Sequence, residues 1–135
     1  MKFDSKIVAI LRQDLLIWQK LNVTAFIMSG ISGRPEVLGE PYVDGCGHVY
    51  LPMSKQPIMI YAANGEQLKE LLIKAQNKEV SLAIYTAELF NIYNDDDNRA
   101  KVAEFETNDL NLVGIGMIGK KNHIDRLTKG LVLHE

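Results

Sequence analysis

The stretch from Lys6 to Gly30 constrains the fold most, because a short apolar run passes directly into a helical pattern. The apolar run covers residues 7–11. Beyond it, apolar residues recur every three or four positions, at Trp18, Leu21, Ala25 and Met28. This combination predicts a buried strand at about 6–12 followed by a helix at about 18–29. The loop of such a unit lies at the carboxyl edge of a sheet, where ligands bind.

Three further apolar segments have the length and composition of strands, near 57–63, 81–86 and 112–118. A helix is predicted after the first of them. Asn64 and Gln67 have the spacing of a capping box at its start. Its buried stripe is predicted from the helical spacing of Leu68, Leu71, Leu72 and Ala75.

Shorter helices are predicted in the last third of the chain. Thr86 is expected to cap a helix over Ala87–Tyr93, and a second short helix is expected to end at Phe105. Asn122 and Asp125 suggest another capping box, for a last helix at about His123–Lys129.

Strands alternate with helices, and the strands are apolar throughout, which indicates a sheet covered on both faces. The prediction is a single α/β domain over residues 1–135, a three-layer α/β/α sandwich around four main strands. Residues 31–57 form an excursion with a hairpin at about 40–53 and a glycine-rich tip. The hairpin carries more apolar surface than a free hairpin should expose, which predicts a homodimer that covers it.

Composition narrows the class of protein. The net charge of −2 and pI of about 5.9 make nucleic acid an unlikely partner, because nucleic-acid-binding domains are usually basic. The single cysteine, Cys46, cannot form an internal disulfide and fits a reducing compartment. The N-terminus has no apolar signal region, and no apolar run approaches 18 residues. The expectation is a cytoplasmic protein with no membrane partner.

Three motifs resemble those of type II peptidyl-tRNA hydrolases. An apolar strand precedes Arg12-x-Asp14-Leu15 and then a lysine, Lys20; the centre has Asp96-x-x-Arg99; the end reads Ile124-Asp125-Arg126-Leu127-Thr128-Lys129-Gly130-Leu131. The resemblance implies a hydrolase in which a lysine near position 20 and the aspartate at 96 are catalytic. The hydrolases have a threonine after the arginine, where this chain has Ala100. Alanine has no hydroxyl to orient a water molecule, which argues against the same activity.

The chain also resembles, over nearly its whole length, a bacterial family of unknown function with this fold. The resemblance is carried by Trp18–Val23, Gly39–Tyr42, Tyr50–Met53, Asp97–Ala100 and Lys129–His134. It implies an α/β/α sandwich around a mixed four-stranded sheet whose last strand is antiparallel. It implies no established activity.

Charged and polar residues near the predicted cleft are the site candidates. Lys20 lies in the first turn of the first helix, a natural place for a phosphate or a carboxylate, although it could equally be a solvated helix residue. Arg12 and Asp14 could pair with each other or bracket a ligand. Asn22 falls one turn from Trp18 and Phe26, against the apolar stripe, where its amide needs partners. Asp96, Asp97 and Arg99 either contribute to the site or cap the following helix.

The glycines at 114, 116 and 119 match a dinucleotide-binding string, but too few residues follow them for the acidic ribose ligand. We expect them instead to let a helix or loop approach the strand closely. No metal site and no cofactor are predicted, because the three histidines share no ligand spacing.

Two functions therefore stay open. One is binding of a small anionic ligand in the cleft over the first helix, with Arg12, Asn22, Asp97 and Arg99 as further ligand contacts. The alternative is hydrolysis of an aminoacyl- or peptidyl-type ester or amide, with Lys20, Asp14 and Asp96 as catalytic residues. Peptidyl-tRNA cleavage is expected to be orders of magnitude below that of a true hydrolase.

Overall fold

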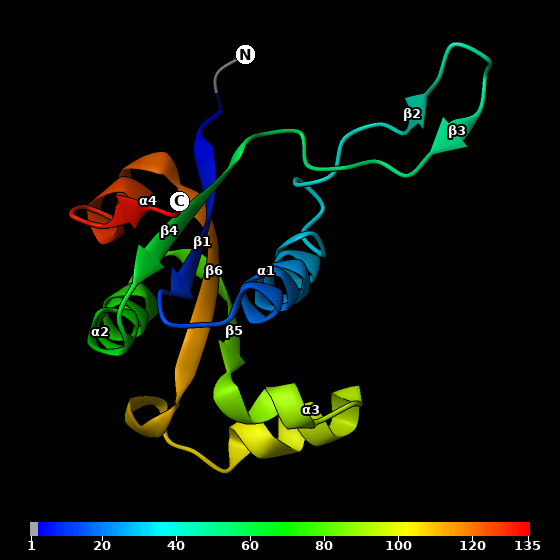
Figure 1. Cartoon of the computed structure of the whole chain (residues 1–135). Coiled ribbons are helices and arrows are strands. Elements are labelled where there is room, and N and C mark those ends of the chain that lie inside the picture. Colours follow the sequence, from blue (N-terminus) through cyan, green and yellow to red (C-terminus); the bar gives the residue numbers. More distant parts are fainter. Residues whose placement is uncertain (1–2) are drawn as a thin grey trace.

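The computed structural model of the chain describes residues 3–135, and Figure 1 shows the order of its elements. The strands are β1 (Ser5–Arg12), β2 (Tyr42–Val43), β3 (Val49–Tyr50), β4 (Ile58–Ala63), β5 (Val80–Thr86), β6 (Leu112–Lys120) and β7 (Val132–Leu133). The α-helices are α1 (Ile17–Ile31), α2 (Gly65–Gln76), α3 (Asp95–Ala103) and α4 (Lys121–Leu127), and two 3₁₀ helices are η1 (Ala87–Asn91) and η2 (Thr107–Asp109). No helix in the described residues is both long enough and apolar enough to cross a membrane.

The main sheet is mixed and has five strands in the order β5-β6-β1-β4-β7. β1 is parallel to β4 and antiparallel to β6, and β6 is also antiparallel to β5. All four predicted strands are present, but the count of four is wrong, because Val132–Leu133 pairs with β4 as a fifth strand. Two residues are too few to show a strand period, so the sequence pattern could not separate this strand from a loop.

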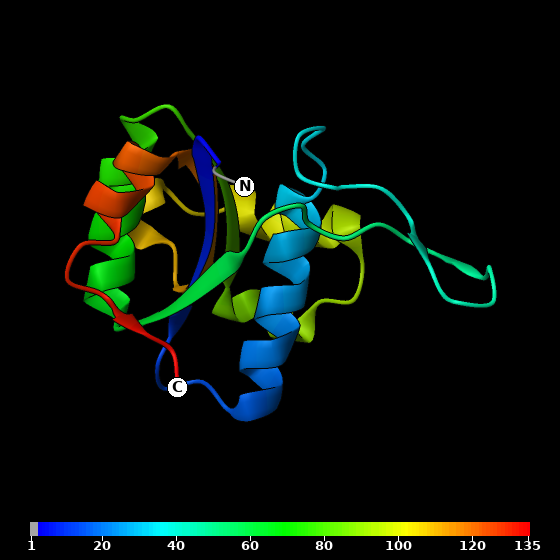
Figure 2. The ribbon, with the colours of Figure 1, turned by 90° about the horizontal axis from the view of Figure 1, so that it is seen from above.

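Helices lie on both faces of this sheet, as Figure 2 shows. α2 and α4 pack on one face and α1 on the other. The predicted stripe of α2 is confirmed, since Leu68, Leu71, Leu72 and Ala75 are its buried residues. Its capping box is confirmed as well. The Gln67 N–H donates to Asn64 Oδ1 at 2.8 Å, and the Asn64 N–H donates to Gln67 Oε1 at 2.9 Å.

The buried face of α1 is not the predicted one. Trp18 and Leu21 are exposed, whereas α1 buries Val23, Ile27 and Ile31. The cause lies in β6, where a Cβ added at Gly114 would come within 2.5 Å of Val23 Cγ1. The glycines of β6 therefore let α1 lie directly on the strand, as their spacing suggested. Both faces of α1 are apolar, and packing against β6, β5 and β1 decides which one is buried.

Two other predicted caps are wrong. α4 begins at Lys121 with no side-chain cap, and Asp125 instead accepts a hydrogen bond from Lys6 Nζ of β1 at 2.7 Å. This bond raises the pKa of Lys6. Thr86 is buried and does not cap the segment that follows it, which is a 3₁₀ helix rather than an α-helix.

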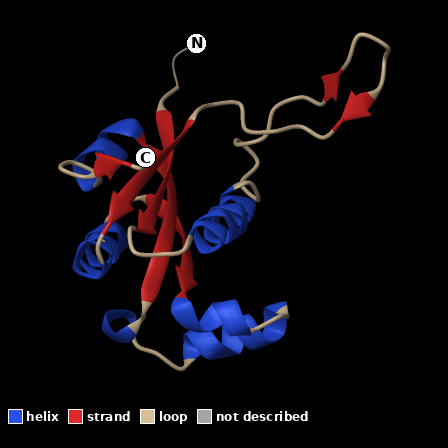
Figure 3. Cartoon of the chain, in the orientation of Figure 1, coloured by secondary structure: helices blue, strands red, loops and turns tan. Residues whose placement is uncertain are grey.

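The hairpin of the excursion is present and projects from the body of the molecule in both views (Figures 1 and 2). We call residues 39–53 the arm. Figure 3 shows that most of the arm is loop, with only the short strands β2 and β3 paired near its tip. At the base of the arm, its two chain segments are linked by a bridge between Leu38 and Ser54 and by a hydrogen bond from the Gly39 N–H to the Met53 oxygen, 2.9 Å long.

Candidate functional site

The loop between β1 and α1 is held at the carboxyl edge of the sheet. The Gln13 N–H donates to the Ala63 oxygen of β4 at 2.9 Å, and Leu15 is buried. The Leu16 N–H donates to Gln19 Oε1 at 3.0 Å, which satisfies the last amide before the helix. Lys20 therefore lies in the first turn of α1, whose start is held by these contacts.

The exposed apolar face of α1 forms one wall of a groove, which we call the α1 groove. Its volume is about 640 Å³, and the opposite wall comes from β1, β4 and the end of the chain. The residues that line it are Leu11, Ile17, Lys20, Leu21, Thr24, Ala25, Ile60, His134 and Glu135. The groove is mainly apolar, so the few polar groups in it determine what it can bind.

Lys20 is half-buried in this groove, and its ammonium has no hydrogen-bond or ion-pair partner among residues 3–135. The Thr24 hydroxyl is occupied, because it donates to the Lys20 backbone oxygen at 2.7 Å. The His134 backbone N–H donates to the Ile60 oxygen at 2.8 Å, which fixes the histidine against β4. Its Nε2 is buried and has no partner in the described part of the chain. Lys20 Nζ is therefore the polar atom that the groove offers to a ligand, whereas His134 Nε2 is unpartnered but buried.

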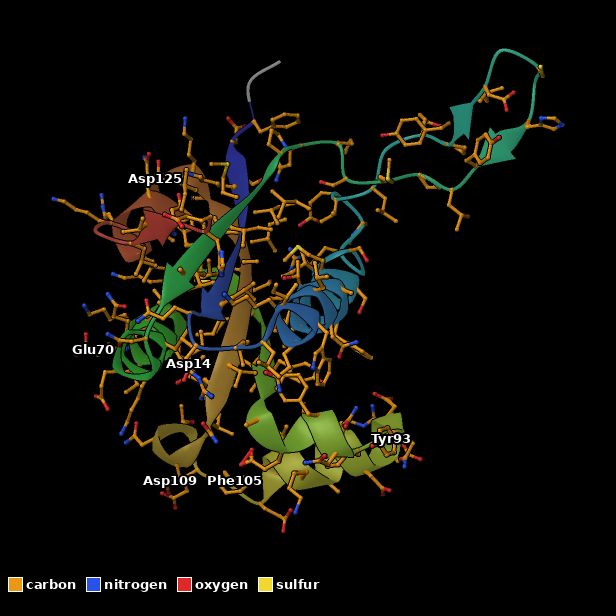
Figure 4. The ribbon with its side chains drawn as sticks, in the orientation of Figure 1. Asp14, Glu70, Tyr93, Phe105, Asp109 and Asp125 are labelled. Atoms are coloured by element: carbon orange, nitrogen blue, oxygen red, sulfur yellow. The ribbon has the colours of Figure 1, made fainter. Side chains whose placement is uncertain are left out.

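Arg12 and Asp14 lie on the other flank of α1, in a hollow of about 450 Å³ that shares no residue with the α1 groove. They pair with each other, since Arg12 Nε donates to Asp14 Oδ1 at 2.6 Å. Arg12 Nη1 also donates to Asn111 Oδ1 at 3.1 Å. Figure 4 shows Asp14 at the loop between β1 and α1. It also shows Tyr93, which lines the same hollow, beside α3. The guanidinium is thus engaged within the protein.

The acidic residues of α3 are occupied in their own helix. Arg99 pairs with Asp95, and its Nη2 donates to Asp96 Oδ1 at 2.7 Å. The hydrogen bond that Arg99 donates to Asp95 raises the pKa of Arg99. Asn94 caps the helix by accepting the Asp97 N–H at 2.8 Å, and its side-chain amide donates to Asp97 Oδ2 at 2.7 Å. Carboxylates in the first turn also stabilise the positive end of a helix.

The structure therefore separates the predicted site residues. Lys20 lines the α1 groove, Arg12 and Asp14 line the second hollow, and Asp96, Asp97 and Arg99 lie on the exposed surface of α3. Asn22 is half-buried on α1 and lines neither hollow. No group of three His, Cys, Asp or Glu side chains in residues 3–135 is arranged to hold a metal ion.

Sequence reasoning missed Ile60 and His134 as groove residues. Ile60 reaches the groove because β4 lies beside β1, and His134 reaches it because β7 pairs with β4 and brings the end of the chain alongside. One signal was present: Gly130, with φ +88°, reverses the chain after α4 and is followed by three apolar residues. That pattern is typical of a helix end that leads into a strand.

Comparisons with known proteins agree with the bacterial resemblance. A family described as "Protein of unknown function (DUF2000)" matches residues 5–135. A solved structure of a protein of unknown function from Agrobacterium tumefaciens strain C58 is 41% identical, with a TM-score of 0.94 over 99% of this chain and 100% of that one. No curated protein matches. The likeness to type II peptidyl-tRNA hydrolases stays a resemblance of motifs. The chain belongs to the DUF2000 family, whose function is unknown.

Proposed function

We propose that this protein binds a small amphipathic anion, a carboxylate carrying an apolar chain, in the α1 groove. The observation that supports the proposal is the ammonium of Lys20, which has no partner among residues 3–135 and stands at an apolar groove. An amine at the edge of an apolar surface favours a ligand with one negative charge and an apolar body.

The lining of the groove narrows the ligand class. Leu11, Ile17 and Ile60 offer apolar contacts, and each buried methylene contributes about 0.8 kcal/mol. Lys20 supplies one charge-assisted hydrogen bond, and His134, whose Nε2 is buried without a partner in the described part of the chain, lies in the wall of the groove. Glu135 also lines the groove and would repel a doubly charged phosphate more than a single carboxylate. A monocarboxylate fits these groups better than a phosphate.

We also propose that the protein acts in the cytoplasm as a homodimer, with a second copy covering the arm. Val49, Tyr50 and Leu51 of the arm are 68%, 55% and 85% exposed. Apolar side chains gathered in this way usually mark an interface. The arm is also the part of the chain that reaches furthest from the body (Figure 1).

The alternative, hydrolysis of an aminoacyl- or peptidyl-type ester or amide, has less support. It would need Lys20, Asp14 and Asp96 to act on one substrate, but Asp14 lines a different hollow and Asp96 is paired with Arg99 on α3. Three carboxylates in the first turn of α3 would also repel the phosphates of a tRNA.

Binding is tested by calorimetric titration with decanoate as the probe. A hydrogen bond to a charged group contributes about 1.5–3 kcal/mol, so Lys20→Ala should weaken binding roughly 10- to 100-fold. Lys69→Ala is the matched control, because Lys69 is exposed on α2 across the sheet and should leave the affinity unchanged. Decanol, which has no charge, should bind both proteins equally. Equal decanoate affinity in wild type and Lys20→Ala would refute the proposal.

A turnover assay tests the alternative. Peptidyl-tRNA cleavage should be orders of magnitude below that of an authentic hydrolase, and Ala100→Thr should not restore it, because Asp96 remains paired with Arg99. Turnover comparable to the authentic enzyme that is lost in Lys20→Ala would instead establish the hydrolase.

A further inference from the structure

The arm has an apolar surface on both of its faces. Tyr42 is paired with Tyr50 and Val43 with Val49, so the register places the two tyrosines on one face and the two valines on the other. All four are about half exposed or more. An interface with a flat surface would cover only one face of the two-stranded arm. Two apolar faces are expected of an arm that lies in a groove.

The arm is also preformed. The carboxylate of Asp44 accepts hydrogen bonds from the Cys46 N–H at 2.9 Å, the His48 N–H at 3.1 Å and the Tyr50 hydroxyl at 2.8 Å. Gly47, at φ +91°, closes the turn in a conformation that other residues rarely adopt. An isolated two-stranded hairpin is only marginally stable in water, so a shaped arm of this kind needs a surface to rest on. Docking it would cost little ordering entropy.

The same chain carries a groove of matching character. The α1 groove is apolar, and Ile17 and Leu21 on its wall are 78% and 68% exposed. A second copy of the chain brings both an arm and a groove, so a twofold dimer can cover both grooves at once. Each arm exposes roughly 600 Å² on its large apolar side chains, summed over both faces and taking about 150–200 Å² for each full side chain. With both faces of each arm covered, the two arms and the surfaces that receive them would bury about 2,400 Å² in all, which is enough for a stable dimer.

The charges of the two surfaces are complementary. Residues 39–53 contain Glu40 and Asp44 and no lysine or arginine. The wall of α1 from Ile17 to Phe26 contains one charged residue, Lys20. The acidic arm is therefore attracted to Lys20 on the α1 wall and repelled by Glu135 on the opposite side of the groove, which favours a position of the arm against α1.

We propose that the arm of a second copy lies along the exposed face of α1 and forms the outer wall of the α1 groove, so that each ligand site is completed by the partner. The statement about the ligand rests on the proposed function, whereas the contact between the arm and α1 does not. The open side of the groove is then covered by the partner's arm, which carries the exposed apolar residues Tyr42, Val49 and Leu51.

The single cysteine makes a direct test possible, because Cys46 is exposed at the tip of the arm. A Leu21→Cys variant places a second thiol on the groove wall. Treatment with a bis-maleimide reagent, followed by a denaturing gel, should give at least ten times more covalent dimer than in wild type. Leu21→Cys/Cys46→Ser should lose the product, since the link must join the arm to α1. Glu70→Cys is the matched control, since Glu70 is exposed on α2, on the opposite face of the sheet (Figure 4), and it should give no product above wild type.

Three results would overturn the inference. The first is a monomeric mass of the wild type in light scattering at micromolar concentration. The second is a cross-link as strong in wild type as in Leu21→Cys, which would show that arm tips meet each other. The third is no more covalent dimer in Leu21→Cys than in wild type. As a second probe, Leu51→Asp should convert the dimer to a monomer while the circular dichroism spectrum stays unchanged, because Leu51 is 85% exposed in its own chain. A wild-type protein that fails to bind decanoate but still gives the cross-link with Leu21→Cys would refute the ligand proposal and not this one.

Discussion

Replacing Gly114 with alanine should destabilise the protein by about 1–3 kcal/mol, the usual cost of overpacking a core. The added Cβ would come within 2.5 Å of Val23 Cγ1 and 3.4 Å of Leu11 Cδ2. The valine is fully buried between α1 and β6, and a β-branched side chain has few alternative rotamers, so the helix must shift outward. For a chain of this length 1 kcal/mol corresponds to roughly 3–5 °C in Tm.

The steric origin is tested by a double-mutant cycle in thermal and urea unfolding. Val23→Ala alone should cost about 1.5–3 kcal/mol, because it leaves a cavity. The double variant should be more stable than the sum of the two single effects by about 0.5–3 kcal/mol, since the new methyl enters that cavity. Gly65→Ala is the control, because nothing lies within 4 Å of a Cβ at that position. A Gly114→Ala protein as stable as wild type, or strict additivity in the cycle, would refute the close contact.

Three other predictions concern separate parts of the molecule. Asn64→Ala should lower the unfolding free energy by about 1 kcal/mol in urea titrations, because the N-cap of α2 is lost. Leu72→Ala should lower the unfolding free energy by about 2–5 kcal/mol in the same assay, since Leu72 is on the buried face of α2. In the arm, the hydrogen bond from the Tyr50 hydroxyl lowers the pKa of Asp44, followed by the bond from the Cys46 N–H. The contribution of this carboxylate to the stability of the arm is therefore fully present above its ordinary pKa of 3.8 and is lost as the pH falls through the lower pKa of the folded state. The NMR shifts of the arm amides should show an acid transition that Asp44→Ala removes.

The strands and α2 were predictable because each follows from a local pattern. The run Ile7–Leu11 is buried in β1, and Asn64 with Gln67 marks the start of α2 at the observed residue. These signals depend on neighbours within a few positions. Where the fold depends on distant residues, the pattern was insufficient.

The orientation of α1 is the clearest case. Its sequence supports two apolar faces, one with Trp18 and Leu21 and the other with Val23 and Ile27. The choice between them is made by Gly114, which lies about ninety residues further along the chain and admits the valine. Helical period alone carries no information about this partner.

The candidate site was predictable only in part for the same reason. Lys20 does line a groove, but the other wall includes Ile60 and His134. Ile60 is placed by the pairing of β4 with β1, and His134 by the pairing of β7 with β4. Asp96 and Arg99 have a spacing that resembles a hydrolase site, yet the same spacing of three residues lets them pair on one helix.

The position of β6 in the sheet has a consequence for how the chain folds. β6 lies between β5 and β1, and its register joins Ser5 to Lys120. Until β6 has been synthesised, β5 has no neighbour in the sheet and β1 has only β4. At roughly 5–20 residues per second, the ribosome leaves the apolar β1 without its antiparallel partner for about 5–20 s. Folding must therefore wait for a long-range contact, which places this chain among slow-folding topologies and makes the nascent chain a natural substrate for chaperones.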